Sequence, residues 1–172
     1  MFQNYQNIKN ILENLNITFN EIEHLESHSC NDSKKYRSEL GLNGLGSKNI
    51  VFHCKGNFYL VTTHGDKSIK ARNFKREFGS KDIRFASQDE INSIGLGTIG
   101  SISPFGFDNT LIPVFVDTEI FENEYFIFNP FVPTKSIQIK SEDLKRIYEN
   151  MANNVKFFRH SEEEFEILEK LN

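Results

Sequence analysis

Two runs of β-branched and aromatic residues, separated by a three-residue turn that contains glycine, constrain the fold of this chain most strongly. The runs are NIVFHC (49–54) and FYLVTT (58–63), and Lys55, Gly56 and Asn57 lie between them. Glycine adopts a positive φ without steric cost, and tight turns between antiparallel strands often require one. The pattern therefore predicts a β-hairpin, whose strands we expect near the centre of a sheet.

The remaining periodic segments alternate between helix and strand patterns. Ser87 with Glu90, and Ser161 with Glu164, have the spacing of a capping box at a helix start. Ser141 is the expected N-cap of another helix. We expect helices at 4–16, 31–42, 86–95, 141–151 and 161–171, and further strands at 17–25, 113–117, 124–129 and 135–139. With no repeat or linker, this order predicts an α+β fold, a mixed and largely antiparallel sheet with helices packed around it.

The length and the cysteine content indicate one globular domain, covering residues 1–172. A core of this size buries about 70% of the unfolded surface without disulfides. Cys30 and Cys54 have no metal-ligand spacing, which favours a reducing compartment. The chain start lacks signal-peptide features, and no apolar run approaches the roughly 18 residues that a membrane span needs. We therefore expect a cytoplasmic protein with no membrane partner.

Charge is distributed unevenly along the chain. The net charge of −4 argues against nonspecific coating of nucleic acid, which depends on neutralising phosphates. Between Asp66 and Arg84, however, seven basic and three acidic residues give a net charge of +4. Such a local basic face can bind RNA, or it can be an ordinary solvated helix face.

The segment TIGSISPFGFDN (98–109) contains the densest group of glycine, serine and proline residues. Small residues allow a ligand to approach the main chain, and convergent N–H groups can bind an anion or a developing oxyanion. A plain turn between strands is the alternative.

The other candidate constellations are weaker. His24 and His28 form an H-x-x-x-H pair on a strand end, with no third ligand apparent, so solvated or core histidines are favoured over a metal site. Ser101 and Ser103 lack the G-x-S-x-G context of a nucleophile elbow. We expect neither a metal nor a cofactor.

Three segments together resemble the YbaK/prolyl-tRNA deacylase family, and most closely its ProX/PrdX-like branch. They are SKNIVFHCKGNFYLVTTHGD, IRFASQDEINSIGLGTIGSISPFGFDN and FNPFVPTKSIQIKSEDLKRI, and the similarity runs over about residues 15–150. These free-standing proteins are related to the editing domain inserted in some bacterial prolyl-tRNA synthetases. The resemblance implies a barrel-like sheet surrounded by helices. It also implies a trans-acting deacylase that hydrolyses the ester of a mischarged tRNA, most typically alanine on the tRNA for proline.

The motifs of this family match particular residues here. Lys48, followed by Asn49, matches the lysine on which the family's activity most depends, and Gly100 to Pro104 matches its G-x-x-x-P loop. The resemblance implies that Lys48 supplies a cation, while the amides of Gly100, Ser101 and Ile102 face the ester carbonyl. Such donors contribute about 2.7–4 kcal/mol each to transition-state stabilisation.

The amino-acid pocket is expected to select by size, because a tight pocket rejects the larger proline ring. Its expected lining residues are Asn49, Ser103, Pro104, Phe105, Asn129, Pro130 and Thr134, and ordinary core packing is the alternative for Phe105. The family's H-P-x-x-N-x-x-T motif is altered, since Asn129 replaces the histidine and Pro133 the asparagine. The amino acid that is removed therefore stays open, with cysteine and serine as alternatives to alanine.

The expected partner is the acceptor end of a mischarged tRNA, and prolyl-tRNA synthetase is a second candidate partner; no DNA partner is expected. The basic residues expected to contact tRNA are Lys70, Arg72, Lys75 and Arg76. Two other functions are compatible with the sequence. One is a non-catalytic module that binds tRNA or a synthetase, and the other is a protein that acts on small amino-acyl metabolites.

Overall fold

The computed structural model describes residues 2–27 and 30–171. The helices are α1 (Phe2–Asn14), α2 (Cys30–Glu39), α3 (Lys75–Phe78), α4 (Gln88–Ser93) and α5 (Ser141–Glu149), with 3-10 turns η1 (Ala71–Phe74) and η2 (Thr118–Glu122). The strands are β1 (Asn20–Glu23), β2 (Leu45–Cys54), β3 (Asn57–His64), β4 (Ile83–Phe85), β5 (Val114–Asp117), β6 (Tyr125–Phe128), β7 (Lys135–Lys140), β8 (Val155–His160) and β9 (Phe165–Leu168).

The described strands form one mixed sheet in the order β1-β7-β6-β2-β3-β5-β8-β9, with β4 paired to β2. Five pairings are antiparallel and three are parallel, namely β2 with β6, β3 with β5 and β5 with β8. This confirms the α+β fold with a mixed, largely antiparallel sheet. The predicted hairpin is also confirmed, since β2 and β3 pair over their whole facing lengths.

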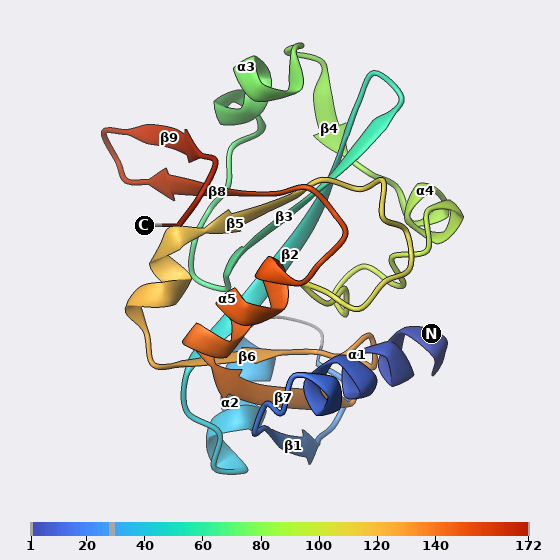
Figure 1. Ribbon diagram of the computed structural model, residues 1–172, viewed down its shortest axis with the longest axis vertical. Coiled ribbons are helices and arrows are strands. Elements are labelled where there is room, and N and C mark those ends of the chain that lie inside the picture. Colours follow the sequence, from blue (N-terminus) through green and yellow to red (C-terminus); the bar gives the residue numbers. More distant parts are fainter. Residues whose placement is uncertain (1, 28–29, 172) are drawn as a thin grey trace.

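Strand β2 connects the two halves of the sheet. Its first residues, Leu45 and Gly46, pair in parallel with β6, whereas the strand from Ser47 onward pairs antiparallel with β3. In Figure 1, β1, β6 and β7 lie in the lower part of the molecule and β3, β5 and β8 in the upper part, with β2 running between them. Lys48 therefore lies directly after the point where β2 changes partner.

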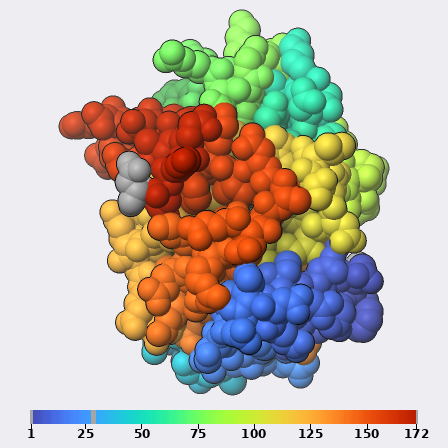
Figure 2. Space-filling model, in the orientation of Figure 1, coloured from blue at the N-terminus to red at the C-terminus, as the bar shows by residue number. Residues whose placement is uncertain are grey.

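Helices α1 and α5 lie next to each other on the sheet. Figure 2 shows the N-terminal helix, in blue, against the orange part of the chain that contains α5. The Arg146 guanidinium of α5 donates a hydrogen bond to the Leu15 carbonyl over 2.7 Å. Ile8 and Leu12 of α1, and Leu144 and Ile147 of α5, belong to the same buried cluster. The helical spacing of Ile8 and Leu12 explains why α1 could be predicted from the sequence.

Phenylalanine, of which the chain has 17, forms a second core at the end of the sheet that carries α3. Phe52, Phe74, Phe115 and Phe158 are each at most 2% exposed there. The ring centroids of Phe74 and Phe158 are 5.6 Å apart in an edge-to-face arrangement. Such pairs stabilise a core by about 0.5–1.5 kcal/mol beyond area burial. This core anchors η1 and α3 to the sheet.

The predicted final helix at 161–171 is wrong, because residues 165–168 form strand β9 and pair with β8. Ser161 and Glu164 instead close the turn between the two strands, where the Glu164 amide donates to Ser161 Oγ over 3.2 Å and the Ser161 amide to the Glu164 carbonyl. Phe165 and Ile167 alternate onto the phenylalanine core. The packing of a period-two pattern on that core outweighs the capping signal.

The start of α5 also differs from the prediction. Lys140 occupies the N-cap position and makes no side-chain cap hydrogen bond, while Ser141 is already helical. Within the described part of the chain, the buried Ser141 hydroxyl has no hydrogen-bond partner. The capping box of Ser87 and Glu90 at α4 is confirmed, with both reciprocal hydrogen bonds present. Among residues 2–27 and 30–171, no helix has both the length and the apolar character needed to cross a lipid bilayer.

Candidate active site

A cavity of about 620 Å³ lies between α2, the start of β2 and the glycine-containing loop at 98–104. Of the residues expected from the sequence, Lys48, Asn49, Gly100, Ile102 and Asn129 line it. These residues come from three separate parts of the chain, so the fold brings together the lysine, the loop and the altered H-P-x-x-N-x-x-T segment. The cavity is thus the place where these groups can act on one ligand.

The ammonium group of Lys48 is held by the main chain of the loop that follows β3. Its Nζ donates a hydrogen bond to the carbonyl oxygen of Lys67 over 3.0 Å. Lys48 is half-buried and lines the cavity. An ammonium has three N–H donors, so this contact leaves donors for a ligand. The arrangement orients a positive charge at the cavity wall.

The side chain of Lys67 is itself fixed by two carboxylates. Its Nζ lies 2.8 Å from Asp117 Oδ2 and 2.8 Å from Glu119 Oε2. Thr63, which is paired with Lys48 across the β2–β3 ladder, donates its hydroxyl to Asp117 over 2.7 Å. Lys67 therefore has a fixed side chain, and its carbonyl offers Lys48 a well-placed acceptor.

These contacts also set the charge states of the group. Burial disfavours a charged Lys67, but hydrogen bonds from its ammonium to Asp117 and Glu119 outweigh burial and raise its pKa. The same Lys67 hydrogen bond lowers the pKa of Glu119. Both partners are ionised at neutral pH.

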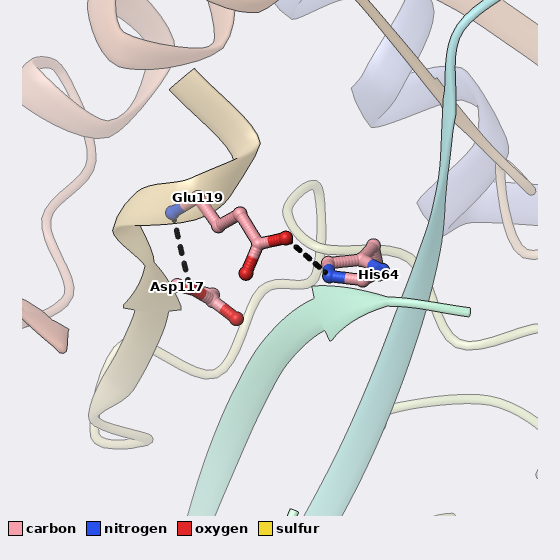
Figure 3. A group of neighbouring side chains, drawn as sticks. All are labelled: His64, Asp117 and Glu119. Carbon is pink, nitrogen blue, oxygen red and sulfur yellow. Dashed lines mark hydrogen bonds and ion pairs between the residues drawn. The ribbon is translucent and has the colours of Figure 1, made fainter. Parts of the chain in front are cut away.

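His64, Asp117 and Glu119 are close enough together to be considered as metal ligands. Figure 3 shows the Glu119 carboxylate directed toward the His64 ring, and His64 Nε2 lies 3.2 Å from Glu119 Oε1. However, the Lys67 ammonium already contacts both carboxylates. A divalent cation would have to compete with this charge. We therefore interpret the cluster as a support for Lys67 and assign no metal to it.

Asn49 joins β2 to the glycine-containing loop. Its side-chain amide donates to the Ile102 carbonyl over 2.9 Å, and its oxygen accepts a hydrogen bond from the Thr62 hydroxyl over 2.8 Å. Gly100 in the loop has a φ of +95°, a conformation that L side chains rarely adopt. The loop is thus fixed to the strand that carries Lys48.

The three main-chain amides expected to bind an oxyanion are not equivalent. The Ser101 amide donates to the Thr98 carbonyl over 3.0 Å, and the Ser101 side chain is only 3% exposed. The loop uses this N–H to close its own turn, so the donor role expected of Ser101 is not supported. In the described ranges, the amides of Gly100 and Ile102 have no hydrogen-bond partner. These two amides are the remaining donors.

Several expected lining residues are not part of the cavity wall. Ser103, Pro104, Phe105 and Pro130 are buried elsewhere, and Thr134 is exposed. Phe105 packs in the core with its ring 5.0 Å from that of Phe128, as the alternative interpretation of this residue had it. None of these five residues is therefore placed to contact a ligand in the cavity wall as described.

Arg37, which the sequence did not single out, is the charged residue buried most deeply in the cavity wall. It is 5% exposed, and its Nε donates to Ser136 Oγ over 2.9 Å and its Nη2 to Asn129 Oδ1 over 3.2 Å. Burial lowers its pKa to about 10. The one sequence signal was the strongly polar character of α2, in which Arg37 is the buried residue. A buried polar side chain on such a helix needs hydrogen-bond partners, which Arg37 finds in Ser136 and Asn129.

The four basic residues expected to bind tRNA, Lys70, Arg72, Lys75 and Arg76, are exposed and none of them lines the cavity. They lie around η1 and α3, which Figure 1 places at the opposite end of the long axis from α2. The Lys67 end of this run adjoins the cavity, where Asp66 lies at the wall. The run thus leads from the cavity toward the α3 end.

Of the H-x-x-x-H pair, His24 lies within the described residues, and both of its ring nitrogens contact groups of the protein. His24 Nε2 lies 2.8 Å from Ser136 Oγ, the hydroxyl that also accepts from Arg37, and its Nδ1 lies 2.7 Å from the Leu25 carbonyl. His28 lies outside the described residues. His24 therefore supports the hydroxyl that holds Arg37.

Comparison with known families gives one match over most of the chain. The model of the family described as the aminoacyl-tRNA editing domain matches residues 28–147. This range includes Arg37, Lys48, the glycine-containing loop and Asn129.

Individual relatives are distant. The prolyl-tRNA editing protein ProX of Acetoanaerobium sticklandii is 26% identical over 149 residues, covering 84% of this chain and 90% of that protein. The proline–tRNA ligase of Heliobacterium modesticaldum is 27% identical over 73 residues, which are 42% of this chain but 12% of the ligase.

Solved structures share the fold. A protein with the provisional description of a trans-editing enzyme for prolyl-tRNA synthetase superposes with a TM-score of 0.69 at 16% identity, over 88% of this chain and 94% of that one. A chain from a study of epitope grafting onto scaffold proteins superposes with a TM-score of 0.70 at 13% identity, over 92% of this chain and 97% of its own.

Proposed function

We propose that this protein, which belongs to the aminoacyl-tRNA editing domain family, is a trans-acting deacylase that hydrolyses the ester of a mischarged tRNA. The observation that carries the proposal is that Lys48 lines the same cavity as Gly100 and Ile102, whose main-chain amides have no partner in the described part of the chain. A cation and two N–H donors on one cavity suit a carbonyl that becomes an oxyanion.

The reaction needs little from the protein, because an aminoacyl ester is already activated. We propose that the Gly100 and Ile102 amides polarise the ester carbonyl and stabilise the tetrahedral oxyanion. Each such donor contributes about 2.7–4 kcal/mol in enzymes where one has been removed. Lys48, held by the Lys67 carbonyl, anchors the acceptor end or the developing negative charge. A water molecule then attacks the ester carbonyl carbon, the bond from that carbon to the tRNA oxygen breaks, and a proton from the water passes to this oxygen, which leaves as the tRNA hydroxyl.

Alanine on the tRNA for proline is the first candidate substrate, because a curated relative that matches this chain over 90% of its own length is a prolyl-tRNA editing protein. Serine and cysteine are the alternatives, because Asn129 at the cavity wall differs from the family's histidine. Lys70, Arg72, Lys75 and Arg76 are proposed to contact the acceptor stem while its end enters the cavity. Prolyl-tRNA synthetase is a proposed partner on the strength of the family relation.

A deacylation panel tests this proposal. Purified protein is incubated with alanyl-, seryl-, cysteinyl- and prolyl-tRNA, and the release of amino acid is followed against the spontaneous rate. We expect at least one small acyl group to be released rapidly while correctly charged prolyl-tRNA survives. Tight tRNA binding without release from any of the four would contradict a deacylase and support a binding module.

A further inference from the structure

Arg37 is a buried cation for which the described residues provide no carboxylate counter-ion, and the neighbouring Cys30 side chain raises its pKa by less than burial lowers it. Arg37 is 5% exposed, and its two hydrogen bonds are to a hydroxyl and a neutral amide. In the described ranges no carboxylate lies within 4.0 Å of its guanidinium. A guanidinium has five N–H donors, so these two bonds leave three of them without a partner among the described residues.

Such a charge is costly to bury. Moving an ion out of water costs several kcal/mol even after relaxation, and native proteins usually offset this with an opposite charge. The cost is visible here in the lowered pKa of Arg37, whose leading cause is burial. A neutral residue could make the same contacts with Ser136 and Asn129 at a smaller cost. The positive charge therefore requires an explanation other than attachment of α2.

The chain also makes room for this group at the cavity. Gly46 lines the cavity with Arg37, and a Cβ built on Gly46 would lie 2.7 Å from Arg37 Nη1. Only glycine allows the guanidinium to lie so close to the strand, because any side chain would displace it. Nη1 is the guanidinium nitrogen that has no hydrogen-bond partner in the described part of the chain. The bare edge of the guanidinium thus adjoins the cavity.

We propose that Arg37 is a subsite for an anionic oxygen group of the substrate, bound in the same cavity in which Lys48 and the Gly100 loop act. This inference rests on the proposed function for the identity of the substrate, but not for the presence of the subsite. An aminoacyl-tRNA can supply such a group in two ways. One is a phosphodiester near the 3′ end, and the other is the side-chain carboxylate of an acidic acyl group. Both present the paired oxygens that a guanidinium binds through two N–H donors.

The subsite is tested first with simple anions, independently of catalysis. Inorganic phosphate and acetate are titrated into the full chain at constant ionic strength, and binding is followed by NMR. We expect saturable binding that Arg37→Gln weakens at least tenfold, because glutamine keeps hydrogen-bonding capacity but not the charge. Lys34→Gln, at an exposed cavity lysine, is the matched control and should change binding less than twofold. Failure of the wild type to bind either anion, or unchanged binding by Arg37→Gln, would overturn the proposal.

Two further variants separate anion binding from folding. Arg37→Lys keeps the charge and should retain binding within a few-fold. Gly46→Ala keeps Arg37 but forces its guanidinium to shift, and should weaken binding measurably, though by less than Arg37→Gln does. If Arg37→Gln does not fold, Gly46→Ala decides the question. A folded Gly46→Ala protein that binds anions like the wild type would contradict the proposal.

Substrates then distinguish the two sources of the anion. If the group is a phosphodiester, Arg37→Gln should raise KM for alanyl-tRNA but not for 3′-alanyl-adenosine, which lacks internucleotide phosphates. If it is an acyl carboxylate, the loss should be confined to aspartyl- and glutamyl-tRNA. An equal loss for every substrate would show a structural role and overturn the subsite. Anion binding at Arg37 in a protein that hydrolyses none of these esters would refute the proposed function and leave the subsite standing.

Discussion

The ammonium of Lys48 donates a hydrogen bond to the main-chain carbonyl of Lys67, 3.0 Å away. One lysine therefore positions the other, and the Asp117 and Glu119 carboxylates position Lys67 in turn. The charge that faces the cavity thus depends on a group buried behind it.

Asp117→Asn should impair catalysis although Asp117 does not line the cavity. Asparagine removes the charge that holds Lys67, so the Lys67 carbonyl and the Lys48 ammonium lose their fixed position. A displacement of about 1 Å can cost on the order of 100-fold in rate, so we expect kcat to fall by about 10- to 100-fold. Single-turnover kinetics measure this. Asp82→Asn, which removes the exposed partner of Lys55, is the control and should leave kcat unchanged.

Glu119 should make stability depend on pH at the acid end. Its folded-state pKa is lowered below 4.5 by the Lys67 hydrogen bond, so its contribution is fully present above that value and is lost as the pH falls through the folded-state pKa. Because Glu119 is partly exposed, we expect a contribution of less than about 1 kcal/mol. Urea unfolding of wild type and Glu119→Gln at about pH 7 and about pH 3 measures it. A stability difference that is equal at both pH values would contradict this.

Gly100→Ala should reduce activity through the backbone. A Cβ at Gly100 meets no atom within 4 Å, but the φ of +95° strains any L residue. The left-handed conformation costs about 1–2 kcal/mol for a non-glycine residue, so the loop should shift and misplace the two amides. Gly56→Ala is a matched control, because Gly56 has a φ of +81° and open space in the hairpin turn. We expect the two variants to lose similar amounts of stability. A fall in kcat that occurs in Gly100→Ala and not in Gly56→Ala would support the role of the loop amides as oxyanion donors.

An element of the fold could be predicted from the sequence when the contacts that determine it lie within a few residues of one another. The hairpin and the α4 capping box were predicted because Gly56, Ser87 and Glu90 act within a few residues of one another. The Ser161 and Glu164 signal failed because the same two residues can close a turn between strands. Only packing of β9 on the phenylalanine core, which is remote in sequence, decides between the two outcomes.

In the candidate site, too, residues that belong to short sequence motifs were predicted, and features that depend on the folded conformation were not. The motif match identified Lys48 and the Gly100 loop, and both line the cavity. The sequence could not show that the Ser101 amide closes its own turn, because that depends on the loop conformation. Arg37 was missed because a charged residue on a polar helix is usually exposed. Its burial depends on contacts with β7 and Asn129, about 90 to 100 residues away.

Reversing the exposed basic residues Lys70, Arg72, Lys75 and Arg76 to Glu should weaken tRNA binding without altering the chemistry in the cavity, since none of them lines it. Log K for tRNA binding falls as log salt rises, and each lost phosphate contact makes this negative slope less steep by about one unit. Filter binding over a salt series measures this. Lys140→Glu with Lys170→Glu, at exposed sites outside the run, is the control. Unchanged affinity for tRNA would favour a protein that acts on small amino-acyl molecules.

The most direct test of the account is the single-turnover deacylation rate of Lys48→Ala on the mischarged tRNA that the wild type hydrolyses best, with tRNA affinity measured alongside. Loss of one charged donor to an oxyanion predicts a fall of about 100- to 1000-fold, while Lys34→Ala at the exposed cavity lysine should keep nearly the wild-type rate. A Lys48→Ala protein that binds tRNA normally and deacylates at the wild-type rate would show that this ammonium takes no part in the reaction.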